Sequence, residues 1–273
     1  MKSLVFPFFQ DMTRRSTLPV VACLTLTILA CSLGSPAPTG GATAQGPEAG
    51  RDDLTPTAPV VQNPTSTTDA PLDDELSESD ILQIVRASLA AYPWRLDQSV
   101  VVKGTGQTST TLTEAQSSTR GYNQSVENLG TETITIESII IDSLVYVKMT
   151  GSPSATYGLV DGQWTELPPG SPLLQLVDTG AIDPARVADF FATDFASLRG
   201  DGNPNELLFM LAGSETLNGV ATNIYESEGA TFTYRWWIGA DQRFYKTTVD
   251  LPEATRTIVM DYDPGITVQP PIP

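Results

Sequence analysis

The order of hydrophobic patterns along residues 73–273 constrains the fold of this chain more than any other feature. Apolar residues with the two-residue period of a half-buried strand lie toward both ends of this region, in TETITIES and again in 232–238. Between them, residues 187–198 carry apolar side chains at helical spacing. Strands, then helices, then strands predict an α+β domain, with a curved antiparallel sheet and a few helices against one face.

Helices are expected in two parts of this region. Ser77 is a suitable N-cap for a first helix that Pro93 ends, with its apolar residues on one face. In the middle, Asp183-Pro184 predicts an N-cap followed by proline at the first helical position. Two short apolar runs, 171–177 and 207–211, flank this second helix, and we assign both to the helical insertion between the two β parts.

Strands are expected on both sides of that insertion. The predicted strands before it are 100–103, 108–113 and a hairpin of 139–141 with 144–148 around Asp142-Ser143. After it, Asn218-Gly219 is the strongest short signal for a hairpin. Tyr234, Trp236 and Ile238 then share one face of a strand with Phe232, and 243–249 and 255–262 complete the sheet.

The N-terminus indicates export. Arg14 and Arg15 precede an apolar run of thirteen residues, 18–30, which suits a signal peptide and is short of the roughly 20 residues that span a membrane. The run ends in ILAC, which resembles the bacterial lipobox, so Cys31 is predicted to receive a lipid and to begin the mature chain. An ordinary signal peptide or an uncleaved anchor, with Cys31 incidental, is the alternative. The start (Met1 or Met12) and the export route (Sec or Tat) stay open.

We therefore divide the chain into a signal peptide (1–30), a lipidated linker (31–72) and one folded domain (73–273). The linker is rich in Pro, Gly, Ala, Thr and Ser and has almost no large apolar residue, so it cannot bury enough surface to offset its ordering entropy. It should tether the domain to the extracytoplasmic face of the cell membrane without orienting it.

Composition excludes several classes of function. The chain has no histidine, and no cysteine after Cys31, which excludes disulfides, zinc or copper sites built on these residues, and histidine-based catalytic triads. The loop that starts at Asp201 lacks the glycine and glutamate that a calcium loop needs at its sixth and twelfth positions. A formal net charge of −17 opposes binding of nucleic acid. We expect no cofactor, no metal and no enzymatic activity.

Three segments in this order resemble the LolA/LolB-like superfamily, in particular exported lipoproteins of the LppX and LprG type. They are ESIIIDSLVYVKM followed by DGQW, AGSETLNGVATNIYE, and WWIGADQRFYKTTVD with IVMDYDPGITVQPP. The resemblance implies that the curved sheet is an incomplete antiparallel β-barrel around an apolar cavity, with helices covering its open concave face. Members of this group carry lipids, lipoproteins or glycolipids, and some act as periplasmic sensors. No individual ligand residue carries over.

The apolar residues of the insertion have two possible roles, which are to fill the core or to line a cavity for acyl chains. A cavity would bind such a chain through roughly 0.8 kcal/mol for each buried methylene. The candidate lining residues are Leu173, Leu174, Val177, Val187, Phe190, Phe191, Phe195, Leu208 and Trp236.

Two functions therefore remain in competition. One is a membrane-anchored exported lipoprotein that binds or transfers a lipid or another acylated ligand in a cavity between sheet and helices. The alternative is a cell-surface binding or signalling module of the same fold, with a filled core and a protein partner that the sequence does not identify.

Overall fold

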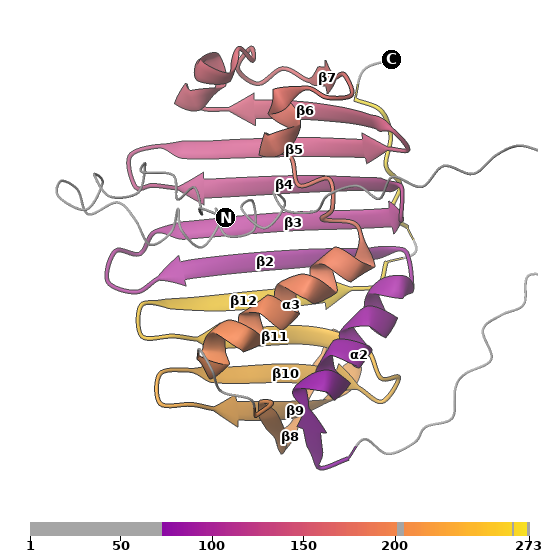
Figure 1. Cartoon of the computed structure of the whole chain (residues 1–273), viewed down its shortest axis with the longest axis vertical. Helices are drawn as coiled ribbons and strands as arrows, with labels where there is room; N and C mark the ends of the chain where they lie inside the picture. Colours follow the sequence, from indigo (N-terminus) through magenta and orange to yellow (C-terminus); the bar gives the residue numbers. More distant parts are fainter. Residues whose placement is uncertain (1–72, 201–204, 264, 272–273) are drawn as a thin grey trace, which may run out of the picture.

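The structure, a computed structural model, describes residues 73–200, 205–263 and 265–271, and the predicted signal peptide and linker lie outside these residues. The described chain forms one twelve-stranded antiparallel sheet with two α-helices on one face (Figure 1). The spatial order is β1-β8-β9-β10-β11-β12-β2-β3-β4-β5-β6-β7. The first long strand therefore pairs with the last, and the two β parts of the sequence become one continuous sheet.

The elements have the following bounds. The strands are β1 (Glu75–Ser77), β2 (Trp94–Val102), β3 (Thr108–Ser117), β4 (Arg120–Asn128), β5 (Thr133–Ile141), β6 (Leu144–Thr150), β7 (Thr165–Leu167), β8 (Leu208–Leu217), β9 (Val220–Glu228), β10 (Thr233–Gly239), β11 (Phe244–Asp250) and β12 (Ala254–Asp261). The helices are α2 (Glu78–Ala90) and α3 (Pro184–Arg199), with short 3₁₀ helices η4 (Ser152–Tyr157) and η5 (Pro172–Leu176).

Local signals explain why the two helices begin where they do. Ser77 and Asp80 form a capping box, in which the Ser77 backbone N–H donates to Asp80 Oδ2 at 2.9 Å and the Asp80 N–H donates to Ser77 Oγ at 3.2 Å. At α3, Asp183 Oδ1 accepts the Ala185 N–H at 2.9 Å, and Pro184 takes the first helical position. Both predicted helix starts are confirmed.

The predicted hairpins are confirmed as well. Asn218 and Gly219, at φ 49° and 84°, connect β8 to β9, and these left-handed conformations are the ones a two-residue turn of this kind requires. Asp142, at φ 56°, begins the turn between β5 and β6. Tyr234, Trp236 and Ile238 on β10 point to the same side and are fully buried, as their alternation predicts.

Two assignments in the insertion are corrected. Residues 207–211 are not helical: Leu208 begins strand β8, which pairs with both β1 and β9. The run 171–177 forms the 3₁₀ helix η5 instead of an α-helix. Strand β4 was not predicted at all, because its sequence RGYNQSVEN is polar on both faces, yet it pairs along its whole length with β3 and β5.

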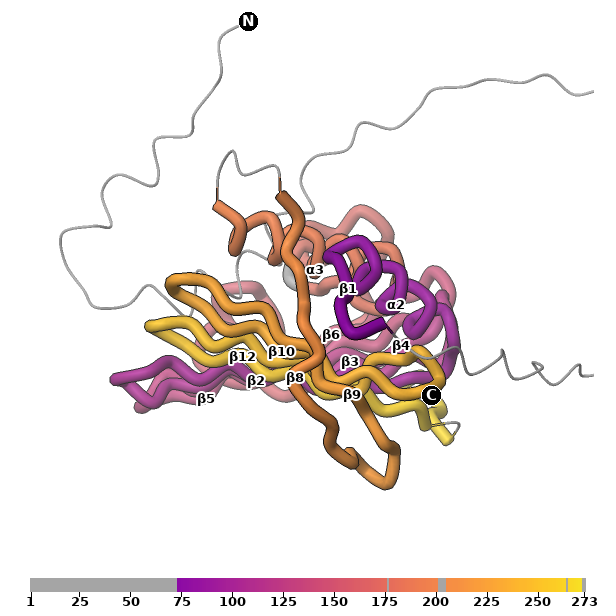
Figure 2. Tube along the Cα trace, turned by 90° about the horizontal axis from the view of Figure 1, so that it is seen from below, coloured from indigo at the N-terminus to yellow at the C-terminus, as the bar shows by residue number. Residues whose placement is uncertain are grey.

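The helices cover only part of the concave face. α2 and α3 lie over the sheet from β8 to β2, whereas the far end of the same face, at β6 and β7, is covered by η4, η5 and the loops beside them (Figures 1 and 2). Three buried clusters result. We name them the helix-covered core, the β6–β7 core, and the convex-face core, where Ile266 and Val268 of the C-terminal segment pack behind β5 and β6.

Candidate ligand-binding site

Aromatic side chains fill the space between the helices and the sheet. Phe191 and Phe195 of α3 and Trp236 of β10 are each fully buried. The Phe191 ring centroid lies 5.1 Å from that of Trp236 and 6.0 Å from that of Phe244. Such spacings are those of directly packed rings, so the helices contact the sheet through these side chains in the helix-covered core.

An ion pair lies at the border of this core. Arg256 of β12 pairs with Asp194 of α3, with side chains only 10% and 17% exposed, and the Arg256 guanidinium lies 5.0 Å from the Phe190 ring centroid. Burial lowers the pKa of Arg256, but the neighbouring Asp194 carboxylate more than offsets this effect, so that the pKa is raised. Burial also raises the pKa of the adjacent Tyr234. α3 is thereby held to the sheet by charge as well as by apolar contact.

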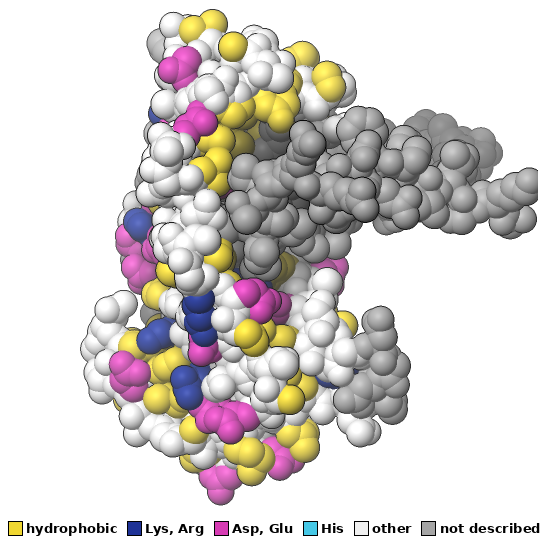
Figure 3. Space-filling view, turned by 90° about the vertical axis from the view of Figure 1, so that its left-hand side faces the viewer, with side chains coloured by type: hydrophobic (Ala, Val, Ile, Leu, Met, Phe, Trp, Pro, Cys, Tyr) yellow, Lys and Arg dark blue, Asp and Glu magenta, His cyan; other side chains and the backbone are white. Residues whose placement is uncertain are grey.

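The β6–β7 core is smaller and separate. Val147 and Met149 of β6 are almost completely buried beneath η5 and the loops beside it, together with Val177. Leu173 and Leu174 of η5 pack against them and are only half-buried. In the side view of Figure 3, apolar side chains (yellow) reach the surface in this upper part of the molecule as well as in the lower part.

Between the two cores, the concave face is polar. The cross-strand register aligns Leu96 of the helix-covered core with Thr113, Asn123 and Ser138, and then with Val147 of the β6–β7 core. Thr111 and Ser125 lie on the same face in the next register row, which ends at Ile136 and Met149. We name these five residues, Thr111, Thr113, Asn123, Ser125 and Ser138, the polar strip.

The polar strip contains uncharged hydrogen-bonding groups. Asn123 Nδ2 donates to Thr113 Oγ1 at 2.8 Å, and Thr111, Asn123 and Ser125 are half-buried. Hydroxyl and amide groups on a strand can bind the polar part of a ligand without imposing a charge on it. The half-buried Ile136 next to them offers apolar surface. The concave face as a whole is therefore suited to an amphiphile.

One end of the strip is closed by close packing. Gly121 lies in the register row beyond Asn123, and a Cβ at this position would stand 2.3 Å from Ile182 Cγ2. Ile182 comes from the segment that leads into α3, and its carbonyl oxygen accepts a hydrogen bond from the Tyr92 hydroxyl at 3.0 Å. Glycine is required here so that this segment can lie directly on the sheet.

The structure divides the predicted lining residues among three places. Phe191, Phe195 and Trp236 lie inside the helix-covered core, with Val187 and Phe190 packed at its border. Leu173, Leu174 and Val177 belong to the β6–β7 core. Leu208 joins neither core, because it lies on strand β8 and is 51% exposed.

The polar strip has no recognisable signature in the sequence. Its residues come from β3, β4 and β5, and a serine or threonine on a strand carries no signal that separates a concave-face position from a solvent-facing one. Only the register of β4 brings them into line.

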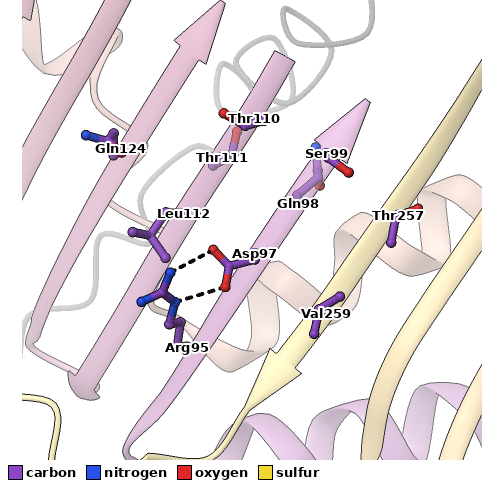
Figure 4. Close-up of a pocket in the computed structure, with 10 residues that line it drawn as sticks. All are labelled: Arg95, Asp97, Gln98, Ser99, Thr110, Thr111, Leu112, Gln124, Thr257 and Val259. Atoms are coloured by element: carbon purple, nitrogen blue, oxygen red, sulfur yellow. Dashed lines mark hydrogen bonds and ion pairs between the residues drawn. The ribbon is translucent and has the colours of Figure 1, made fainter. Parts of the chain in front are cut away.

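The opposite, convex face carries two open hollows. The smaller, of about 310 Å³, lies over β12, β2, β3 and β4, and a bidentate Arg95–Asp97 pair lies on it (Figure 4). The larger, of about 660 Å³, lies between the β8–β9 hairpin and β10 to β12.

Within 73–200, 205–263 and 265–271, acidic residues form no group of three that could hold a metal ion. The acidic loop at Asp201 lies partly outside these ranges. Among the same residues, no helix is both long enough and apolar enough to cross a membrane.

Comparison with known proteins finds similarity in structure only. No protein-family model matches the chain, and a search of curated proteins returns no match. Among solved structures, LprF from Mycobacterium bovis is 13% identical, with 71% of this chain and 97% of that chain covered and a TM-score of 0.42. LppX from Mycobacterium tuberculosis is 14% identical, with 70% and 99% covered and a TM-score of 0.36.

A LolA superfamily protein from Nitrosomonas europaea also matches, at 9% identity, with 68% of this chain and 92% of that chain covered and a TM-score of 0.20. The structural matches thus include LppX and the LolA superfamily, which the three sequence segments resemble.

Proposed function

We propose that this chain is an exported lipoprotein, anchored through Cys31 at the extracytoplasmic face of the cell membrane, that binds a lipid or another acylated ligand on its concave face. The observation that carries this proposal is the polar strip between two apolar cores. In this arrangement, the acyl chain would lie against the half-buried Ile136, Leu173 and Leu174, and the polar part of the ligand would hydrogen-bond to the half-buried residues of the strip.

The expected binding free energies assign different roles to the acyl chain and to the polar part of the ligand. Each buried methylene contributes roughly 0.8 kcal/mol, so ten or more contribute about 8 kcal/mol or more against the cost of ordering ligand and protein. The strip then fixes orientation, because its hydroxyl and amide groups lose their partners if an apolar chain covers them. The ligand-binding surface in this proposal is the strip with its apolar borders, not the filled space beneath α2 and α3.

A charge placed on the strip should weaken binding of the acyl ligand. In the chain from Ser32 onward, which lacks the lipid-bearing Cys31, we expect Ser125→Glu to weaken binding of a neutral fluorescent monoacylglycerol at least tenfold, about 1.4 kcal/mol. The bound ligand must desolvate the added carboxylate, which stands beside Ile136, where the acyl chain begins to contact the sheet. Fluorescence titration measures the affinity.

The matched control is Gln124→Glu, which adds the same charge at the next residue but on the convex face. It should change the affinity less than twofold. Equal losses in both variants, with unfolding midpoints unchanged, would contradict a site on the concave face.

The anchor is tested separately. In cells grown with an alkynyl palmitate analogue, the full chain should become labelled and fractionate with membranes. Cys31→Ser should remove the label, whereas Cys23→Ser should keep it, since Cys23 lies within the apolar run and not at its end. Label retained by Cys31→Ser would show that another group carries the lipid.

The second candidate function is a binding module with a protein partner. The filled helix-covered core favours it, because Phe191, Phe195 and Trp236 occupy the space that a ligand cavity beneath the helices would need. Failure of the wild-type chain to bind the monoacylglycerol, together with a crosslinked protein partner at the cell surface, would select this function over the first.

A further inference from the structure

The larger hollow on the convex face has an apolar floor and a charged rim. Trp237 and Ile224 face each other across β10 and β9, and Ala212 of β8 lies beside them. Trp237 is only 6% exposed, so most of its ring is covered by neighbouring side chains. The complete lining is Ala212, Ile224, Glu226, Arg235, Trp237, Lys246, Thr248, Asp250 and Thr255.

The β8–β9 hairpin forms one wall of this hollow. A register shift between Leu211 and Gly213 bends β8, and the hairpin leaves the plane of the sheet on the side away from the helices (Figure 2). Glu215 of the hairpin accepts the Trp237 indole N–H at 2.7 Å. This hydrogen bond holds the wall against the floor, so the hollow is a built feature of the fold.

The charges on the rim are paired, with one exception. Arg235 pairs with Glu226, and Lys103 Nζ lies 2.7 Å from Asp250 Oδ1, a contact that lowers the pKa of Asp250. Lys246 forms no ion pair with any carboxylate of the described chain, and its Nζ lies 4.2 Å from the Trp237 ring centroid. An ammonium without a carboxylate partner is notable in a chain with a net charge of −17.

We propose that this hollow binds a small monocarboxylate with a flat apolar body, such as an aromatic carboxylate. The ligand carboxylate would pair with the Lys246 ammonium, and its apolar body would lie against Ala212, Ile224 and the small part of Trp237 that is exposed. Thr248 and Thr255 add hydroxyl groups at the edge. A volume of about 660 Å³ is within the usual range for small-molecule sites.

The pairing of the charges around the hollow favours a ligand with a single negative charge. Glu226 and Asp250 are paired with Arg235 and Lys103, and the Glu215 carboxylate accepts the Trp237 indole N–H, so the Lys246 ammonium is the cation with which a ligand carboxylate can pair. A single ligand carboxylate neutralises this ammonium. The second charge of a phosphate would instead be repelled by Glu226 and Asp250. The proposal is independent of the acyl-ligand site, which lies on the opposite face of the sheet.

The test compares an acid with its neutral isostere. Titration calorimetry of the full chain in detergent should detect binding of indole-3-acetate and at least tenfold weaker binding of indole-3-acetamide. Lys246→Gln should remove this preference, because it keeps the side-chain stem on Trp237 but loses the charge. Lys148→Gln, which alters a lysine paired with Glu137 at the far end of the sheet, should keep the preference.

Three outcomes would overturn the proposal. They are equal affinity of the wild-type chain for acid and amide, an unchanged preference in Lys246→Gln, or no binding of indole-3-acetate at millimolar concentration. Lys246→Gln should leave the affinity for the monoacylglycerol unchanged, because the two sites lie on opposite faces of the sheet. Ser125→Glu should likewise leave the affinity for indole-3-acetate unchanged. Failure of one site is therefore distinguishable from failure of the other.

Discussion

Phe191→Ala is expected to lower the free energy of unfolding by about 3–5 kcal/mol, the usual cost of deleting a buried phenylalanine. Phe191 is fully buried between α3 and the sheet, and its ring packs on Trp236, Phe244 and Phe190. Trp236 and Phe244 are fully buried themselves and lie on paired strands, so they cannot move into the space that the ring leaves. The cavity therefore persists, and its lining loses dispersion contacts as well as transfer free energy.

The neighbouring residue provides the control. Phe190 is the same residue type on the same helix, but it lies at the border of the core and is only half-buried. Phe190→Ala should cost less than half as much, about 1–2 kcal/mol, since it loses less buried area. Urea unfolding followed by circular dichroism measures both. A Phe191→Ala cost below 1 kcal/mol, or equal costs, would mean that the helix-covered core can collapse or is not closed.

Removing one partner of the buried ion pair is expected to cost a similar amount. Asp194→Ala leaves the Arg256 guanidinium without its carboxylate at a position where its side chain is 10% exposed, and a broken buried pair typically costs about 3–5 kcal/mol. An arginine guanidinium keeps its proton at any ordinary pH even without a carboxylate partner, so the cost cannot be avoided by loss of that proton.

Two comparisons separate this cost from simple loss of packing. The double variant Asp194→Leu with Arg256→Met replaces both charges by apolar groups and should recover most of the stability. Asp97→Ala removes the partner of Arg95 in an exposed pair, with side chains 41% and 47% exposed, and should cost less than about 1 kcal/mol. If the double variant is as unstable as Asp194→Ala, the ion pair is not the source of the effect.

Elements with strong local signals could be predicted from the sequence. The N-cap at Ser77, the Asp183-Pro184 start of α3 and the Asn218-Gly219 turn each depend on residues within about three positions of one another, and the structure confirms all three. The alternation in β10 was found for the same reason. These signals act through hydrogen bonds and backbone conformations that a particular residue type satisfies locally.

The errors occurred where local signals were absent or ambiguous. An apolar run of five residues, 207–211, fits a helix or a strand equally well, and its pairing with β1 and β9 decides for the strand. Strand β4 has no apolar alternation, because its concave side carries Asn123 and Ser125 of the polar strip and its convex side mixes Tyr122 and Val126 with polar residues. Local sequence also does not separate the two cores: Trp236 and Leu173 are both apolar and buried or half-buried, but they belong to different cores.

What the sequence by itself determined is therefore the set of elements with their caps and turns, the α+β class, and the absence of histidine and, after Cys31, of cysteine chemistry. Only the tertiary structure decided which strands are neighbours, and with that the polar strip between two cores and the lysine above Trp237 in the convex hollow. The reason is that strand pairing uses backbone hydrogen bonds, which every residue except proline can make. The junction of β12 with β2, which unites the two β parts, thus depends on how the whole chain packs and not on any residue within it.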